Sequence, residues 1–141
     1  MARPAAESRL RSILVANGND QERNGIAFML ESLDYSVDEA ATVEAGLFRL
    51  ANGPGQYGLA IVDANLPSER GDDYDAAPLV RDVVAQGIPL VYISLRPRES
   101  QIAMLAGNPP GSLVGRNLLE VLQRPYDPTR LAETARRMYR G

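Results

Sequence analysis

The amino-acid sequence predicts a single doubly wound α/β domain, in which a parallel sheet of five strands is covered by helices on both faces. Fully apolar runs of β-branched and small residues, which suit strands buried on both faces, recur along the chain. Stretches with apolar residues at helical spacing separate these runs, an alternation that favours a parallel sheet. The chain has 141 residues and no internal repeat, so we expect one domain over 12–141 after a flexible arm over 1–11.

The first predicted strand, 13–16, is followed by a turn and an amphipathic helix. The apolar residues of this helix recur at helical spacing, namely Ile26, Met29, Leu30 and Leu33. Asn19, with Glu22 three residues later, resembles a capping box at the start of the helix. Asp20 is an alternative cap, because an aspartate before an amphipathic run is a typical helix start.

The next elements are an edge strand, a second helix and a central strand. The stretch 35–41 is more polar than the other predicted strands, which is typical of a sheet edge. Thr42 caps the second helix, which ends at 52–55 and whose expected inner side is Val43, Leu47, Leu50 and Ala51. The run 59–62 is an unbroken apolar stretch and predicts a strand that is buried on both faces.

The second half of the chain supplies the remaining strands and helices. Pro78 suits only the first turn of the third helix, whose apolar residues are Val80, Val83 and Val84 and which Gly87 closes. A buried strand over 88–94 follows, a short helix over 99–106 fits the next stretch, and 121–122 belong to a fifth strand. Asp127 caps a final helix that has Pro128 at its first position.

The composition excludes several kinds of chemistry. There are no cysteines and no histidines, which rules out disulfides, thiol nucleophiles, imidazole catalysis and histidine-ligated zinc. Fifteen basic and eighteen acidic residues give a net charge of −3 without a strong basic patch, so nucleic acid is not expected as a partner. No apolar run approaches the length of a membrane span, and we therefore expect a cytoplasmic protein with no membrane partner.

Three polar side chains directly follow predicted strands. Asp63 follows the central strand, Ser94 the fourth and Arg124 the fifth. Parallel strands all end at the same edge, and ligands collect at the carboxyl edge of such sheets. We therefore expect these three residues to lie together at a candidate functional site.

These positions resemble those of response-regulator receiver domains, over 12–139. That family has an acidic pair after the first strand, an aspartate after the third, a serine or threonine after the fourth and a Lys-Pro after the fifth. The corresponding residues here are Asn17 with Gly18, then Asp63, Ser94, and Arg124 with Pro125, while Asn65, Pro67 and Gly71 stand at the family's usual offsets from the aspartate. The resemblance implies a flavodoxin-like sheet with the strand order 2-1-3-4-5 and a cis bond before Pro125.

The resemblance also implies a chemistry, from which this sequence departs. In the family the aspartate takes a phosphoryl group from a histidine kinase, and Mg²⁺ bound to the acidic pair compensates the charge. Here Asn17 and Gly18 carry no charge, so magnesium binding is expected to be weak at best, with Asp63, Asn65, Asn17 and Asp20 as the available ligands. A guanidinium at Arg124 can form two parallel hydrogen bonds with Asp63 and fill the place of a phosphoryl group. Leu95 is bulkier than the residue usual in the family and is expected to narrow the entrance.

Three functional hypotheses follow. The first is a pseudo-receiver, a signalling module and not an enzyme, that keeps one conformation through the Asp63–Arg124 pair and needs no cofactor. The second is a working phosphoacceptor, phosphorylated on Asp63 in a phosphorelay and dependent on Mg²⁺. The third and weakest is a small hydrolase with Asp63 as nucleophile, because no general base or metal cluster accompanies it.

The expected partner is another protein, either a sensor histidine kinase or a downstream effector. The stretch 97–123 is longer than the receiver pattern and contains a break at 108–111, which suits either a binding loop or a tolerated insertion. A homodimer through 97–139 is a further hypothesis.

Overall fold

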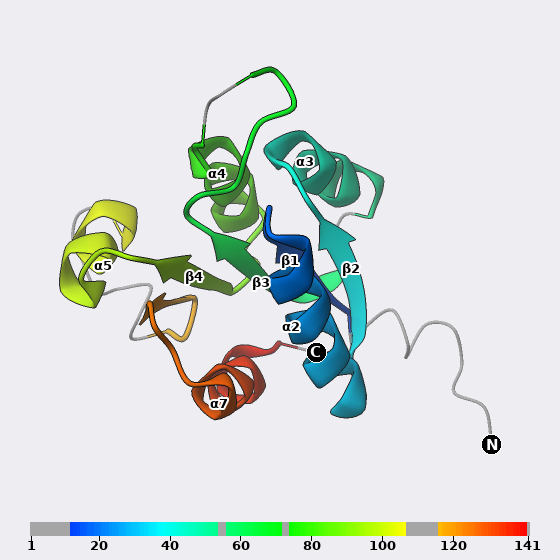
Figure 1. Ribbon diagram of the computed structural model, residues 1–141, viewed down its shortest axis with the longest axis vertical. Helices are drawn as coiled ribbons and strands as arrows, with labels where there is room; N and C mark the ends of the chain where they lie inside the picture. Colours follow the sequence, from blue (N-terminus) through cyan, green and yellow to red (C-terminus); the bar gives the residue numbers. More distant parts are fainter. Residues whose placement is uncertain (1–11, 54–55, 72–73, 107–115, 141) are drawn as a thin grey trace.

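The computed structural model describes residues 12–53, 56–71, 74–106 and 116–140 and contains one parallel five-stranded sheet (Figure 1). The strands are β1 Ser12–Ala16, β2 Ser36–Ala40, β3 Tyr57–Asp63, β4 Leu90–Ser94 and β5 Leu119–Gln123. The helices are α2 Asp20–Ser32, α3 Val43–Asn52, α4 Ala77–Ala85, α5 Arg98–Ala106 and α7 Pro128–Met138. The strand order is β2-β1-β3-β4-β5, which confirms the predicted fold class and the flavodoxin-like order.

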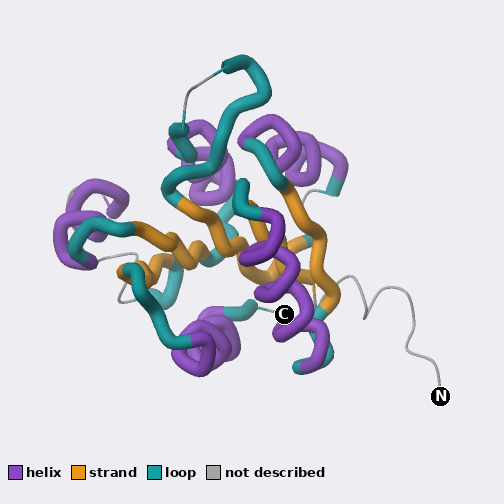
Figure 2. Tube along the Cα trace, in the orientation of Figure 1, coloured by secondary structure: helices purple, strands orange, loops and turns teal. Residues whose placement is uncertain are grey.

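The sheet separates two hydrophobic cores, because successive side chains of a strand point to opposite faces. Figure 2 shows helices on both faces of the sheet. Ile13 and Val15 of β1 pack with α2 and α7, whereas Leu14 and Ala16 pack with α3 and α4. The central strand β3 is buried along its whole length, as its continuous apolar run predicts. Helices therefore cover both faces of the sheet, and the carboxyl edge of the sheet is the place where a functional site can form.

The predicted helix starts are confirmed. Asn19 caps α2 by accepting a hydrogen bond from the Glu22 backbone N–H at 2.9 Å, and the Thr42 hydroxyl accepts one from Ala45 at 3.1 Å. Asp127 caps α7, which has Pro128 in its first turn. These side chains replace the intrahelical acceptors that the first turn of a helix lacks.

Some predicted boundaries and inner faces were wrong. The fourth strand begins at Leu90 because Pro89 has no N–H to donate, and β5 pairs with it from Leu119 onward, earlier than expected. In α3 the inner face is Val43, Gly46 and Leu50, so Ala51 is exposed and Leu47 only partly buried. A Cβ atom at Gly46 would lie 2.7 Å from Leu79 Cδ2, so the helix turns this glycine toward α4. In α4, Leu79 takes the inner place expected of Val84, which is exposed.

Two expectations concern residues outside the described ranges, the arm over 1–11 and the break at 108–111. The predicted short helix before that break is present as α5, which begins one residue earlier than expected. Among the described residues, no helix combines the length and the apolar character needed to cross a membrane.

A buried carboxylate on β5 holds the last helices to the sheet edge. Glu120 is 7% exposed and accepts hydrogen bonds from Arg98 Nε of α5 at 2.7 Å and from Arg137 Nη2 of α7 at 3.3 Å. Its Oε1 also accepts the backbone N–H of Val121 at 2.9 Å. One acid thus joins helices that cover opposite faces of the sheet.

We expect Glu120→Ala to lower the free energy of unfolding by about 2–3 kcal/mol, because it leaves two arginines without their common acceptor. Urea denaturation at neutral pH measures this. The matched control is Glu99→Ala, because Glu99 is largely exposed and lies as far as 3.9 Å from Arg98, a loose ion pair. This change should alter the free energy of unfolding by no more than about 0.5 kcal/mol. Equal effects of the two changes would contradict a structural role for Glu120.

Candidate functional site

The three residues expected at one sheet edge do lie there. Asp63 ends β3, Ser94 ends β4, and Arg124 directly follows β5. The backbone N–H of Arg124 donates to the Ser94 carbonyl at 2.8 Å, which fixes the two loops side by side. The Arg124–Pro125 bond is cis, as the resemblance implied.

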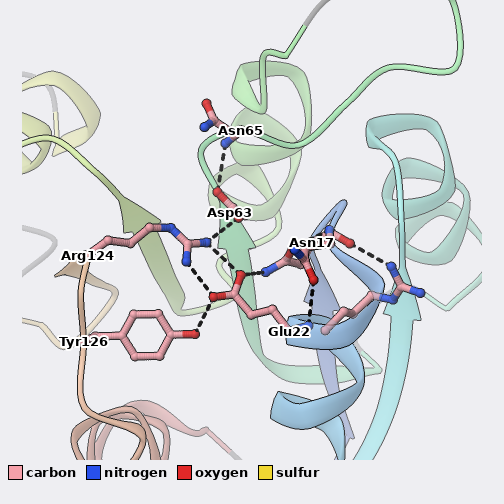
Figure 3. Close-up of polar contacts among 8 residues, drawn as sticks. Asn17, Glu22, Asp63, Asn65, Arg124 and Tyr126 are labelled. Atoms are coloured by element: carbon pink, nitrogen blue, oxygen red, sulfur yellow. Dashed lines mark hydrogen bonds and ion pairs between the residues drawn. The ribbon is translucent and has the colours of Figure 1, made fainter.

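The Arg124 guanidinium lies between two carboxylates (Figure 3). Its Nη2 donates to Asp63 Oδ2 at 2.5 Å, so the expected pair with Asp63 is present. The two parallel bonds, however, go to Glu22, with Nη1–Oε2 at 2.6 Å and Nη2–Oε1 at 2.8 Å. The prediction of a two-bond pair with Asp63 was therefore wrong: Glu22 on α2 faces the planar fork, and Asp63 receives one bond from its side.

Glu22 is the site residue that sequence reasoning missed. Its Oε2 also accepts the Tyr126 hydroxyl at 3.0 Å, and its Oε1 accepts the amide of Asn17. Only half of the capping box is formed. The Asn19 side chain accepts the Glu22 backbone N–H, but the Glu22 side chain does not accept the Asn19 backbone N–H in return. That N–H donates to Asn17 Oδ1 at 2.8 Å. One signal could have identified Glu22: it lies four residues before the buried Ile26, so it shares the inward face of α2 at the end nearest the sheet edge.

The residues at the place of the acidic pair are structural here. Asn17 is 1% exposed and joins the α2 cap to Glu22. A Cβ atom on Gly18 would lie 2.5 Å from Pro67 Cδ, so a side chain does not fit without a shift of the loop. Asp20 neither caps α2 nor lies with the other candidate metal ligands; it is 80% exposed and paired with Arg23 at 2.8 Å.

Magnesium does not fit the side chains present. Asp63 Oδ1 accepts the Asn65 backbone N–H at 2.9 Å, and Oδ2 accepts Arg124. Both oxygens of Glu22 are likewise occupied by donors. Among the described residues, no group of three or more acidic side chains is placed to hold a metal ion. A hard cation would have to displace a guanidinium that is already bound to both carboxylates.

Ser94 is directed toward α5. Its hydroxyl donates to the Gln101 side-chain oxygen at 3.3 Å and accepts the Arg96 backbone N–H at 3.1 Å. Both Ser94 and Gln101 are almost completely buried, and with Asp63 they line a depression of about 720 Å³. Leu95, which was expected to narrow the entrance, lies at the rim of this depression and is 66% exposed.

The charges of the cluster stabilise one another. Hydrogen bonds from Arg124, followed by those from Asn17 and Tyr126, lower the pKa of Glu22 to about 2 despite its partial burial. The bonds to Glu22 and the negative charge of Asp63 raise the pKa of Arg124 above its ordinary value. At neutral pH Glu22 and Arg124 therefore both carry their charges.

Stability should depend on pH through Glu22. A carboxyl group whose pKa is lower in the folded state contributes stability above its unfolded pKa of about 4.5 and loses it as the pH falls toward about 2. At pH 7, Glu22→Gln should reduce the free energy of unfolding by about 1–2 kcal/mol, because the side chain is partly exposed. Urea denaturation between pH 7 and pH 3 should show this difference shrinking over the acid range. Glu31→Gln on the exposed face of the same helix is the control, and a difference that persists unchanged at low pH would contradict the assignment.

Comparisons with known proteins agree with this architecture. No protein-family model matches the sequence, and no curated protein is significantly similar to it. The receiver domain of the hybrid histidine kinase CckA is 24% identical, with a TM-score of 0.67 over 92% of this chain and 99% of that chain. A two-component response regulator from Clostridium difficile is 18% identical, with a TM-score of 0.69 over 90% and 93% of the two chains. The receiver domain of NtrX from Brucella abortus is 20% identical, with a TM-score of 0.68 over 89% and 96%. The chain has the receiver-domain fold.

Proposed function

We propose that this chain is a receiver-type signalling module that acts through protein–protein interaction and keeps one conformation without a phosphoryl group. The observation that carries the proposal is the position of Arg124, which bonds to Asp63 and, through two further bonds, to Glu22. In this pseudo-receiver the side chain that follows β5 holds the aspartate permanently, and no chemical reaction is assigned to it.

The electrostatics of the cluster support this proposal. A carboxylate that attacks a phosphoryl group needs cations to compensate the like charges. Here the single guanidinium is shared by two carboxylates, so Asp63, Glu22 and Arg124 together carry a net negative charge toward an incoming phosphate. Gly18 and Asn17 supply no acid that would bring a metal ion to the site.

The alternative is a phosphoacceptor in which a histidine kinase phosphorylates Asp63. The location of Asp63 favours this alternative, because the side chain lines two adjoining depressions at the edge where phosphate would enter. It requires Arg124 to leave Asp63 and a metal to bind without an acidic pair. A hydrolase remains the weakest hypothesis, since the donors around Asp63 are engaged in holding it.

The proposed partner is a protein, either a sensor histidine kinase or a downstream effector, in the cytoplasm. The proposed contact region is the surface that includes α5, β5 and α7. The same surface would form the interface of the proposed homodimer through 97–139. Part of this region, 107–115, lies outside the described residues.

A magnesium titration tests the proposal. If Arg124 satisfies both acids, backbone amide NMR shifts of residues 17–20 and 63–65 should not saturate as Mg²⁺ is added through the millimolar range. Asp63→Asn provides the control for nonspecific salt effects, because it removes a required ligand. Saturable shifts in the native chain that disappear in Asp63→Asn would favour the phosphoacceptor alternative.

A further inference from the structure

The depression beside the ion-pair cluster has a floor of buried polar side chains. Tyr92, Ser94 and Gln101 are each more than nine-tenths buried and line this cavity of about 720 Å³. Ser94 and Gln101 bond to each other, whereas no hydrogen bond from the Tyr92 hydroxyl to another described residue is present. The Tyr92 hydroxyl and the Gln101 amide are accessible from the cavity rather than sealed in the core, and polar groups that converge on a cavity are typical of small-molecule sites.

The charges around the cavity favour an uncharged ligand. Its described lining includes two carboxylates, Asp63 and Asp75, and two guanidinium groups, Arg96 and Arg124. An anion in the cavity cannot pair with Arg124, because this guanidinium already binds Glu22 and Asp63. A cation likewise finds both oxygens of Asp63 occupied. The other two charged residues, Arg96 and Asp75, are exposed to water, where an ion pair contributes little. A neutral molecule therefore avoids the cost of removing an ion from water without a buried counter-charge.

The rim of the cavity is apolar and exposed. Tyr74 and Leu95 are about two-thirds exposed and Met104 is 60% exposed, and all three line the cavity. Large apolar side chains gathered at the mouth of a cavity are typical of binding sites. An aromatic ring would cover them, and thioether sulfur and tyrosine rings pack well against aromatic faces.

We propose that this cavity is a binding site for a small, uncharged aromatic molecule that carries a hydrogen-bonding group such as a carboxamide. The ring lies against Tyr74, Leu95 and Met104, and the polar group meets Tyr92 and Gln101 on the floor. The cavity shares Asp63, Ser94 and Arg124 with the candidate phosphoryl site, but the proposed contacts to the ligand come from other residues. Its volume lies within the range that small-molecule sites occupy, about 300–1,000 Å³.

Benzamide is the probe, and benzoate and benzylamine are its charged counterparts. In NMR titrations of the whole chain, benzamide should cause saturable amide shifts over residues 92–96 and 100–104, and both charged analogues should bind at least about tenfold more weakly. Tyr92→Phe removes only the hydroxyl and should weaken benzamide binding about fivefold to tenfold. Gln101→Leu should weaken it similarly.

Phe48→Ala is the matched control, because Phe48 is an exposed aromatic on α3 that does not line the cavity. It should leave benzamide binding unchanged. Absence of saturable shifts up to the solubility limit of benzamide would overturn the proposal. Benzoate binding as tight as benzamide, or binding unaffected by both Tyr92→Phe and Gln101→Leu, would also overturn it. Tyr92→Phe keeps the ring that packs in the core, so its folding can be verified from the remaining amide spectrum.

Discussion

Arg124→Met should lower the free energy of unfolding by about 2–4 kcal/mol at neutral pH, the largest loss expected from a single change at the site. Methionine keeps most of the side-chain volume but leaves Glu22 and Asp63 facing each other without a cation. Arg124→Lys should cost less, about 1–2 kcal/mol, because an ammonium keeps the charge but cannot form the fork with Glu22. Urea denaturation measures both values.

Two comparisons make this result specific. Arg136→Met, an exposed change on α7, should alter the stability by less than about 0.5 kcal/mol. Combining Arg124→Met with Glu22→Gln should cost less than the sum of the two single changes, since both remove the same interaction. A fully additive pair, or an Arg124→Met variant as stable as the native chain, would show that the cluster does not hold the fold.

Acceptor activity should appear when the cluster is rebuilt for a metal. Asn17→Asp with Arg124→Lys restores an acid and a smaller cation, and Glu22→Met removes the carboxylate that would compete for the lysine. We expect phosphorylation of this triple variant by acetyl phosphate and Mg²⁺ to exceed that of the native chain by at least about a hundredfold. The measurement is the intact mass after a fixed incubation.

Gly18→Asp, which would complete the acidic pair, is left out of this variant because its Cβ atom would collide with the Pro67 ring. Adding Asp63→Asn to the triple variant should abolish the gain, which identifies the acceptor. Arg124→Met alone should not create activity, since the charge of the incoming phosphate would still meet two carboxylates. A triple variant that folds and binds Mg²⁺ but remains unphosphorylated would contradict the idea that the missing cation limits the chemistry.

The fold was predictable because its signals are local and repeated. Each inner strand is a continuous apolar run, as in β1 and β3, and Asn19, Thr42 and Asp127 cap helices in the usual way. The meeting of Asp63, Ser94 and Arg124 followed from strand direction alone. These inferences needed only the period of the sequence and the parallel topology.

The partners of each site residue were less predictable because they come from distant parts of the chain. Glu22 and Arg124 are 102 residues apart, and the local pattern around Glu22 fits a capping box equally well. Likewise, Gln101 belongs to a helix whose orientation relative to Ser94 no periodicity fixes. Helix α3 shows the same limit, since contact with Leu79 turned Gly46 inward in place of a larger residue.

The native chain in the same phosphorylation experiment tests the account most directly. Incubation with acetyl phosphate and Mg²⁺ should leave its intact mass unchanged, because Arg124 holds Asp63 and Glu22 in a closed cluster that has no place for a metal ion. The triple variant measured alongside shows that the donor is active. A native chain that gains one phosphoryl group, and loses that gain on Asp63→Asn, would contradict the pseudo-receiver and establish Asp63 as a working phosphoacceptor.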